Sequence, residues 1–280
     1  MGPSRHRGVA RLDVGNAIQD GWTAFSRAPG VFVGFAALLT LLQLILQPLQ
    51  ERLTRGEALS ADPADWVLGL IGLAFSIGVS LWGTVGLVRG SVLALGRRRV
   101  RFRYLLRWDG GALRRLCLAW LLLALLLLAA IAAMLLVFWG AGSAASWLSG
   151  SSSAGIATGL PMLLNLVLGF AVLALAGLFL ILLIYLSVNQ LFLPQIAILE
   201  ARAPLATLQR GRRLVDPQWI LVMLLSLVQL VLLLLGILVM VVGLLVAWPV
   251  VTCNSTAAYL QLAHRGETGV PAATPAEGGV

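Results

Sequence analysis

The residues whose types and spacing best suit ligand binding lie in the basic stretch 97–115. This stretch holds eight arginines and a single acid. Arg101, Arg103 and Arg107 are interleaved with aromatic and aliphatic residues, and Trp108 follows directly. Clustered arginines beside a membrane span attract anionic lipid headgroups at about 1 kcal/mol per charge, and aromatic rings favour headgroup depth. We therefore expect Arg101, Arg103, Arg107 and Trp108 to contact anionic membrane lipids.

Membrane topology alone is the alternative explanation of these arginines. Basic residues near a span resist translocation, so a basic loop stays in the cytoplasm and orients the spans beside it. All 20 basic residues are arginine, and only Arg52 and Arg55 fall outside the segments that we assign to the cytoplasmic side. This rule explains the net charge of +9 without nucleic acid. We therefore expect no nucleic-acid partner.

Side chains suited to catalysis or metal binding are sparse. The only histidines, His6 and His264, lie in polar tails, and Cys117 and Cys253 have no metal-ligand spacing around them. The serines of residues 140–159 have no histidine partner and no Gly-x-Ser-x-Gly elbow. We expect no catalytic residue, no metal and no cofactor, and a protein that is not an enzyme.

The composition indicates a membrane protein. Of the 280 residues, 60% are hydrophobic and 11% are charged, whereas soluble domains have about 25% charged residues. The charge-free runs are long enough to cross a bilayer. The predicted fold class is all-α: a polytopic helical bundle of about six transmembrane helices, with amphipathic helices at the cytoplasmic interface.

The apolar runs place the six spans. They are expected at residues 31–47, 66–88, 117–139, 161–188, 218–238 and 241–262. The first span should close at Pro48, and residues 140–159 should form a flexible outer connector. No charge lies between residues 217 and 263, and this length of helix is about 70 Å, or two crossings. Gly236 and Gly243 bracket the turn, which predicts a tight hairpin.

The spans form a single membrane domain, residues 31–263. Residues 1–30 are expected to be a cytoplasmic tail and an amphipathic helix, and residues 264–280 a disordered cytoplasmic tail. Helical periodicity in residues 12–27 predicts a surface helix, with docking on a neighbouring helix as the alternative. Each predicted hairpin follows such an amphipathic or basic segment (12–27, 101–115 and 204–215), which suggests a threefold repeat.

Small residues line one face of the second span. They are Gly69, Gly72, Ser76, Ser80 and Gly83, at steps of three and four. Such a face lets another backbone approach closely enough for dispersion forces to hold two helices together in lipid. We expect a helix-packing face, and a substrate groove is the alternative.

Two sets of short motifs occur in a characteristic order along the chain. The first set is Ala17-Ile18, Gly21-Trp22, Phe25 and Pro29, and the second is Pro194, Ala197, Glu200, residues 206–213, Trp219, Pro249 and Ala258-Tyr259. In this order they resemble the bacterial membrane-domain families grouped around the glycerophosphoryl diester phosphodiesterase membrane domain. The resemblance covers most of the chain and implies a six-span layout.

The resemblance does not imply phosphodiesterase activity. In the named enzyme the membrane domain is fused to a catalytic barrel that uses His-Arg, Glu-x-Asp and a further histidine. His6-Arg7 matches two letters of that pattern, but no Glu-x-Asp occurs in this sequence. The soluble sequence needed to build a barrel is also missing.

These observations favour a non-enzymatic membrane module that interacts with lipids or anchors and regulates a partner. The expected contacts are membrane lipids and either a protein partner or a second copy of the chain. The alternative is a transporter for small neutral solutes or lipids, lined by Asn165, Gln229 and Asn254 near breaks at Pro194 and Pro249. The expected location is the bacterial plasma (inner) membrane, with both termini in the cytoplasm.

Overall fold

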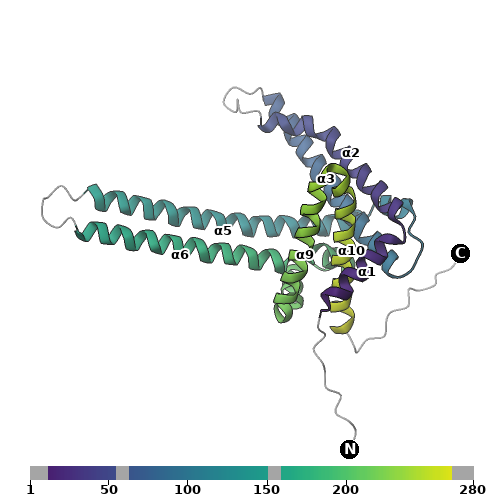
Figure 1. The fold of residues 1–280 in the computed structure, drawn as a ribbon. Coiled ribbons are helices and arrows are strands. Elements are labelled where there is room, and N and C mark those ends of the chain that lie inside the picture. Colours follow the sequence, from purple (N-terminus) through teal and green to yellow (C-terminus); the bar gives the residue numbers. More distant parts are fainter. Residues whose placement is uncertain (1–11, 55–62, 151–158, 267–280) are drawn as a thin grey trace, which may run out of the picture.

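The computed structural model describes residues 12–54, 63–150 and 159–266, and all regular structure within them is helical (Figure 1). Six helical segments in these residues are long and apolar enough to cross a membrane. The chain is therefore an all-α, multi-pass membrane protein, as predicted. Its helices are α1 (Val14–Ser26), α2 (Pro29–Thr54), α3 (Pro63–Leu95), α4 (Phe102–Leu106), α5 (Gly110–Gly150), α6 (Gly159–Asn189), α7 (Leu193–Leu199), α8 (Pro204–Val215), the 3-10 turn η2 (Asp216–Gln218), α9 (Trp219–Leu238) and α10 (Met240–Gly266).

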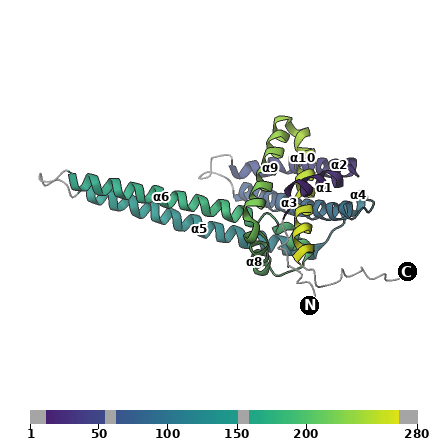
Figure 2. The same ribbon diagram turned by 60° about the horizontal axis from the view of Figure 1, so that its bottom comes forward.

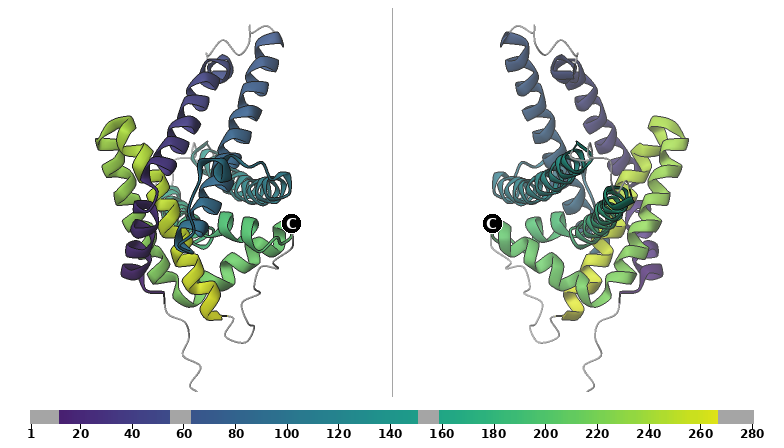
Figure 3. Two further views of the ribbon diagram at one scale, coloured as in Figure 1. Left: turned by 90° about the vertical axis from the view of Figure 1, so that its right-hand side faces the viewer. Right: turned by 90° about the vertical axis from the view of Figure 1, so that its left-hand side faces the viewer.

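The long helices pair into antiparallel hairpins that leave a common base. The hairpins are α2–α3, α5–α6 and α9–α10, and the short helices α1, α4, α7 and α8 lie where they meet (Figures 1 and 3). Each hairpin follows at least one short helix in the chain. The base therefore positions the adjoining ends of the spans relative to one another.

Small residues of α3 pack against α2. A Cβ added to Gly72 would lie 2.5 Å from Cβ of Leu49, and one added to Gly83 would lie 2.5 Å from Cδ1 of Leu39. Ser76 and Ser80 of the same face exchange hydrogen bonds with the side chain of Gln43, as described below. Gly69, the remaining member of the predicted face, is buried. The face is used for helix packing rather than as an open groove.

The α9–α10 hairpin closes with one residue, Val239, between its helices. A Cβ added to Gly243 would lie 2.9 Å from the Cα and carbonyl carbon of Gly236. Real Cβ contacts are essentially never this short, so the two glycines allow the backbones to touch at the turn.

Helix α1 docks on α10. Ala17, Gly21, Ala24 and Phe25 are buried, and Asp13 caps the helix by accepting a hydrogen bond from the backbone N–H of Asn16 at 3.0 Å. The structure therefore shows the docking that was the alternative interpretation of residues 12–27, and a position of α1 at the membrane surface stays a prediction. Apolar periodicity identifies the helix but cannot distinguish lipid from another helix as the partner of its apolar face.

Several helices extend beyond the predicted ends. Pro48 lies inside α2, which continues to Thr54, because a proline removes one backbone hydrogen bond without always ending a helix. Helix α5 continues to Gly150, so most of the expected connector is helical. Helix α10 continues to Gly266, and the rest of the predicted C-terminal tail and residues 1–11 of the N-terminal tail lie outside the described residues.

The α5–α6 hairpin extends away from the other helices in a direction of its own (Figures 1 and 2). The most apolar windows of its two helices contain no residue buried within the protein. With 41 residues, α5 is about 60 Å long, twice the roughly 30 Å of a bilayer core. A helix of this length either tilts in the bilayer or extends beyond it.

Candidate functional site

Helix α4 holds the basic stretch against the ends of α2 and α3. Leu105 is fully buried. A Cβ added to Gly86 would lie 2.7 Å from the carbonyl oxygen of Leu105 and 2.7 Å from Cζ of Phe35. A Cβ added to Gly90 would lie 3.3 Å from Cδ1 of Leu105. Two glycines of α3 make room for Leu105, and the ring of Phe102 packs edge-on against Phe35 with the ring centroids 6.2 Å apart. These two side chains anchor α4, and Leu105 is its only buried residue.

The four residues predicted to contact lipid are all exposed. Arg101 precedes α4, Arg103 lies within it, and Arg107 follows it. Trp108 is 66% exposed. The structure brings Arg107 and Trp108 together at one pocket, whereas Arg101 and Arg103 do not line it.

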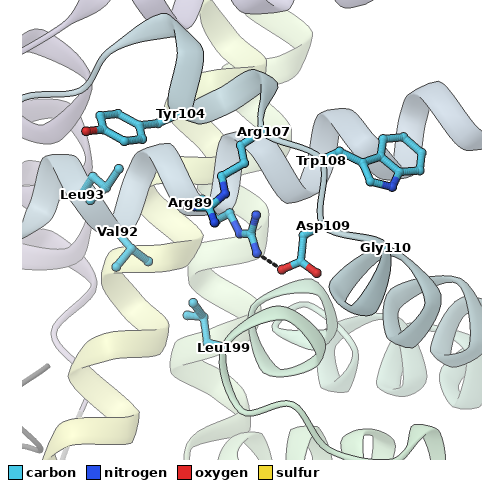
Figure 4. A pocket seen from close by; sticks show the side chains of 9 residues that line it. All are labelled: Arg89, Val92, Leu93, Tyr104, Arg107, Trp108, Asp109, Gly110 and Leu199. Carbon is cyan, nitrogen blue, oxygen red and sulfur yellow. Dashed lines mark hydrogen bonds and ion pairs between the residues drawn. The ribbon is translucent and has the colours of Figure 1, made fainter. Parts of the chain in front are cut away.

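This pocket, the arginine pocket, has a volume of about 660 Å³ and lies between α3, α4 and the start of α5. Its charged and aromatic lining is Arg89, Tyr104, Arg107, Trp108 and Asp109, with Val92, Leu93, Gly110 and Leu199 completing it. Arg89 and Arg107 both line this pocket, and Figure 4 shows Asp109 paired to Arg89. Two guanidinium groups that line one pocket favour the binding of an oxyanion.

Asp109 compensates only one of these two positive charges. Its Oδ1 accepts a hydrogen bond from the backbone N–H of Ala112 at 3.0 Å, and its other oxygen pairs with Arg89. The Ala112 hydrogen bond and Arg89 lower the pKa of Asp109 by more than burial raises it. The carboxylate is therefore ionised at neutral pH. Arg107 has no ion-pair partner within the described residues, so the pocket keeps one net positive charge.

A second charged cluster surrounds Glu200, between α7 and α8. Its carboxylate pairs with Arg202 and, at 3.3 Å, with Arg210, and accepts a hydrogen bond from the Tyr259 hydroxyl at 2.7 Å. Burial raises the pKa of Glu200, but the hydrogen bonds from Tyr259 and Arg202 and the charge of Arg210 outweigh it and hold the pKa below its ordinary value. This cluster ties the base to α10.

A third cluster centres on Asp216. The pair Asp216-Pro217 has the residue types of a helix N-cap and first helical position, which predicts that it starts the fifth span. This prediction is wrong, because Asp216 lies at the C-terminal end of α8 and Gln218 is the N-cap of α9. Its carboxylate accepts hydrogen bonds from Tyr185 at 2.6 Å, Arg212 at 3.3 Å and Asn189 at 3.4 Å. The acid joins α6 to α8 instead of starting α9.

Two glutamines inside the spans form hydrogen bonds with neighbouring helices. The Gln43 amide donates to Oγ of Ser80 at 2.9 Å and accepts from Oγ of Ser76 at 2.6 Å. Gln229 donates to Oγ of Ser255 at 3.0 Å. These contacts join α2 to α3 and α9 to α10, and they leave the glutamine amides engaged.

Asn254 and Asn165, the other residues of the suggested solute path, lie apart. The side chain of Asn254 is fully buried against Gly21, and neither amide atom has a hydrogen-bond partner among the described residues. Asn165 belongs to α6, and its side chain is outside the described ones. The structure therefore does not bring Asn165, Gln229 and Asn254 together along one path.

No group of three histidine, cysteine or acidic side chains in the described ranges could hold a metal ion. Comparisons with protein families, with curated proteins and with solved structures give no match to this chain. The arginine pocket is therefore the best-supported candidate site, on its geometry and charge alone.

Proposed function

We propose that this protein is a non-enzymatic membrane module that binds anionic lipids of the cytoplasmic leaflet through the arginine pocket and the exposed arginines around it. The observation that carries the proposal is Arg107, which is exposed, lines the same pocket as Arg89 and has no ion-pair partner among the described residues. An uncompensated guanidinium at the end of membrane spans attracts anionic headgroups.

The proposal includes the bacterial plasma membrane as the location and the cytoplasm as the side of the base. The distribution of the arginines supports this orientation, because the loops at the base carry nearly all of them. We also propose kinship with the glycerophosphoryl diester phosphodiesterase membrane domain for the membrane layout alone, without its catalysis.

Lipid retention tests this function. The protein is extracted with its native lipid into polymer nanodiscs, and the co-extracted lipids are quantified by mass spectrometry. We expect the triple variant R101Q/R103Q/R107Q to retain less anionic lipid than the unaltered protein, since each arginine contributes about 1 kcal/mol of attraction.

The matched control replaces Arg97, Arg98 and Arg99 with glutamine, which removes the same charge from the same exposed loop without touching the aromatic segment. The control should retain more anionic lipid than the first variant. Equal losses of anionic lipid in the two triple variants would show that only general charge attraction is involved. Unchanged lipid retention in R101Q/R103Q/R107Q would contradict the proposed function.

A second candidate, a transporter for small neutral solutes or lipids, is favoured by the buried and unpartnered amide of Asn254. Such a group could form hydrogen bonds with a polar solute. Solute flux into proteoliposomes that the N254L substitution abolishes would support transport. Unchanged flux, together with a lower melting temperature, would assign Asn254 to helix packing.

A further inference from the structure

Trp108 lines the arginine pocket and also an apolar groove on α3. This groove has a volume of about 390 Å³ and is otherwise lined by Ala74, Phe75, Gly78, Val79 and Trp82. These five residues follow a helical step of three to four, so they form one stripe on the outer surface of α3. A charged pocket and an apolar groove therefore meet at a single indole ring.

The length of the combined site matches one leaflet of a bilayer. Along α3, Ala74 and Arg89 are 15 residues apart, which corresponds to about 22 Å of helix. Half of a bilayer core plus one headgroup layer is about 20 to 22 Å. The order also fits, because the apolar residues lie toward the middle of the span and the arginines lie at its basic end.

We propose that this site binds one phospholipid of the leaflet that faces the base, with its phosphate on Arg107 in the arginine pocket and one acyl chain along the α3 groove. This inference rests on the proposed function and makes it specific, since it assigns a single bound lipid to a defined site. Trp108 lies between the two halves, at the depth of the glycerol backbone, where indole rings are favoured.

The charged half provides the affinity for the phosphate. The guanidinium of Arg107 presents a planar set of donors that matches phosphate oxygens. Asp109 is the one acid that lines the pocket, and it is already engaged by Arg89 and by the N–H of Ala112. Its charge is thereby held away from Arg107.

The apolar half alone would not retain a lipid. Surrounding acyl chains are as apolar as the groove, so no hydrophobic force favours one chain in it over another. Retention requires the phosphate contact and the groove to act on the same molecule. This requirement separates a bound phospholipid from free phosphate, which would use only the pocket, and from a diffuse layer of anionic lipid, which would not need the groove.

Native mass spectrometry tests the proposal. The protein is reconstituted in nanodiscs of equal parts phosphatidylglycerol and phosphatidylcholine, and the phospholipid that remains bound on release is counted per chain. Gly78 is the position to alter, because a Cβ there meets nothing within 4 Å and a leucine side chain would occupy the groove. Leucine also favours the helix over glycine, so the G78L variant should fold.

The matched control is G169L in α6, where a Cβ likewise meets nothing within 4 Å. We expect one retained phospholipid in the unaltered protein and in G169L, and much lower occupancy in G78L. R107Q should weaken binding about fivefold, the effect of one charge. Addition of inorganic phosphate should not restore a bound species in G78L.

Unchanged occupancy in G78L would overturn the proposal. If R101Q/R103Q/R107Q still lost anionic lipid from its nanodiscs, the proposed function would stand and only the single-lipid site would fall. Equal binding of inorganic phosphate alone to the unaltered protein and to G78L would show that the pocket is a site for soluble phosphate. This outcome would also contradict the proposal, because the proposed phospholipid needs the groove.

Discussion

Gly21 and Asn254 bring the backbones of α1 and α10 into direct contact. A Cβ added to Gly21 would lie 2.7 Å from both the Cα and the backbone nitrogen of Asn254. Because backbone atoms cannot rotate aside as a flexible side chain does, any residue larger than glycine at position 21 must separate the two helices. The close approach of α1 to α10 at this point therefore requires the absence of a side chain at position 21.

The G21A substitution should lower the free energy of unfolding by about 1 to 3 kcal/mol, the usual cost of overpacking. Thermal unfolding in nanodiscs measures the effect. The control is G15A in the same helix, where a Cβ would lie 3.5 Å from its nearest neighbour. G15A should leave the melting temperature unchanged or raise it. Equal melting temperatures for the two variants would contradict the close contact.

Replacement of Gln43 by leucine should loosen the α2–α3 hairpin. The change removes the hydrogen bonds to Ser76 and Ser80, and each such bond between membrane helices contributes about 0.6 to 2 kcal/mol. Q47L is the control, since the Gln47 amide reaches only Glu51 of its own helix, at 3.4 Å. A Q43L melting temperature no lower than that of Q47L would show that these bonds add nothing.

Acid should weaken the protein through Glu200. Its folded-state pKa is below the unfolded value of about 4.5, so its stabilising effect is complete above pH 4.5 and is lost as the pH falls through the folded pKa. Unfolding measured from neutral to acidic pH should therefore show a smaller acid-induced loss for E200Q than for the unaltered protein. Identical profiles would contradict the ion-pair cluster.

Tyr259 tests the same cluster without removing the charge. Y259F deletes the 2.7 Å hydrogen bond and should cost about 1 to 2 kcal/mol of stability at neutral pH. The loss should shrink in acid, because a protonated Glu200 no longer has a charge for the hydroxyl to stabilise. A loss that is the same at every pH would assign Tyr259 to packing alone.

Asp109 has two separable roles, and two substitutions divide them. D109N keeps a good helix cap and removes the charge, whereas D109A removes both. Both variants should bind anionic lipid more tightly, about fivefold for one charge, because Arg89 loses its partner. Only D109A should lose about 1 kcal/mol of stability. Lipid binding and thermal unfolding of the same samples check this, and tighter binding in neither variant would contradict the charge balance of the arginine pocket.

The sequence predicts the helices far better than their partners. Apolar length determines the spans, and the pair Gly236 and Gly243 in an uncharged run predicts the last hairpin, since no other chain path buries that run. The sequence cannot predict that α1 docks on α10. A helix that packs on lipid and a helix that packs on another helix have the same amphipathic periodicity. The need for glycine at position 21 becomes evident only when the structure places Asn254, which is distant in the sequence, against it.

The candidate site was half predictable. Arg107 and Trp108 stand out because charged and aromatic residues alternate around them. Arg89 does not, because it follows an apolar run and looks like the end of a span. Glu200 and Tyr259 are 59 residues apart and meet through tertiary packing, which no local pattern encodes. Contacts between distant segments are the part that required the structure.

The single residue between α9 and α10 also constrains how the chain is made. With only Val239 between two apolar helices, the turn provides no polar loop that would have to cross the membrane on its own. We therefore expect α9 and α10 to insert into the bilayer together, as one helical hairpin. Arg210, Arg212 and Arg213 precede this hairpin and Arg265 follows it, so under the proposed orientation the basic segments on both sides of the hairpin stay in the cytoplasm.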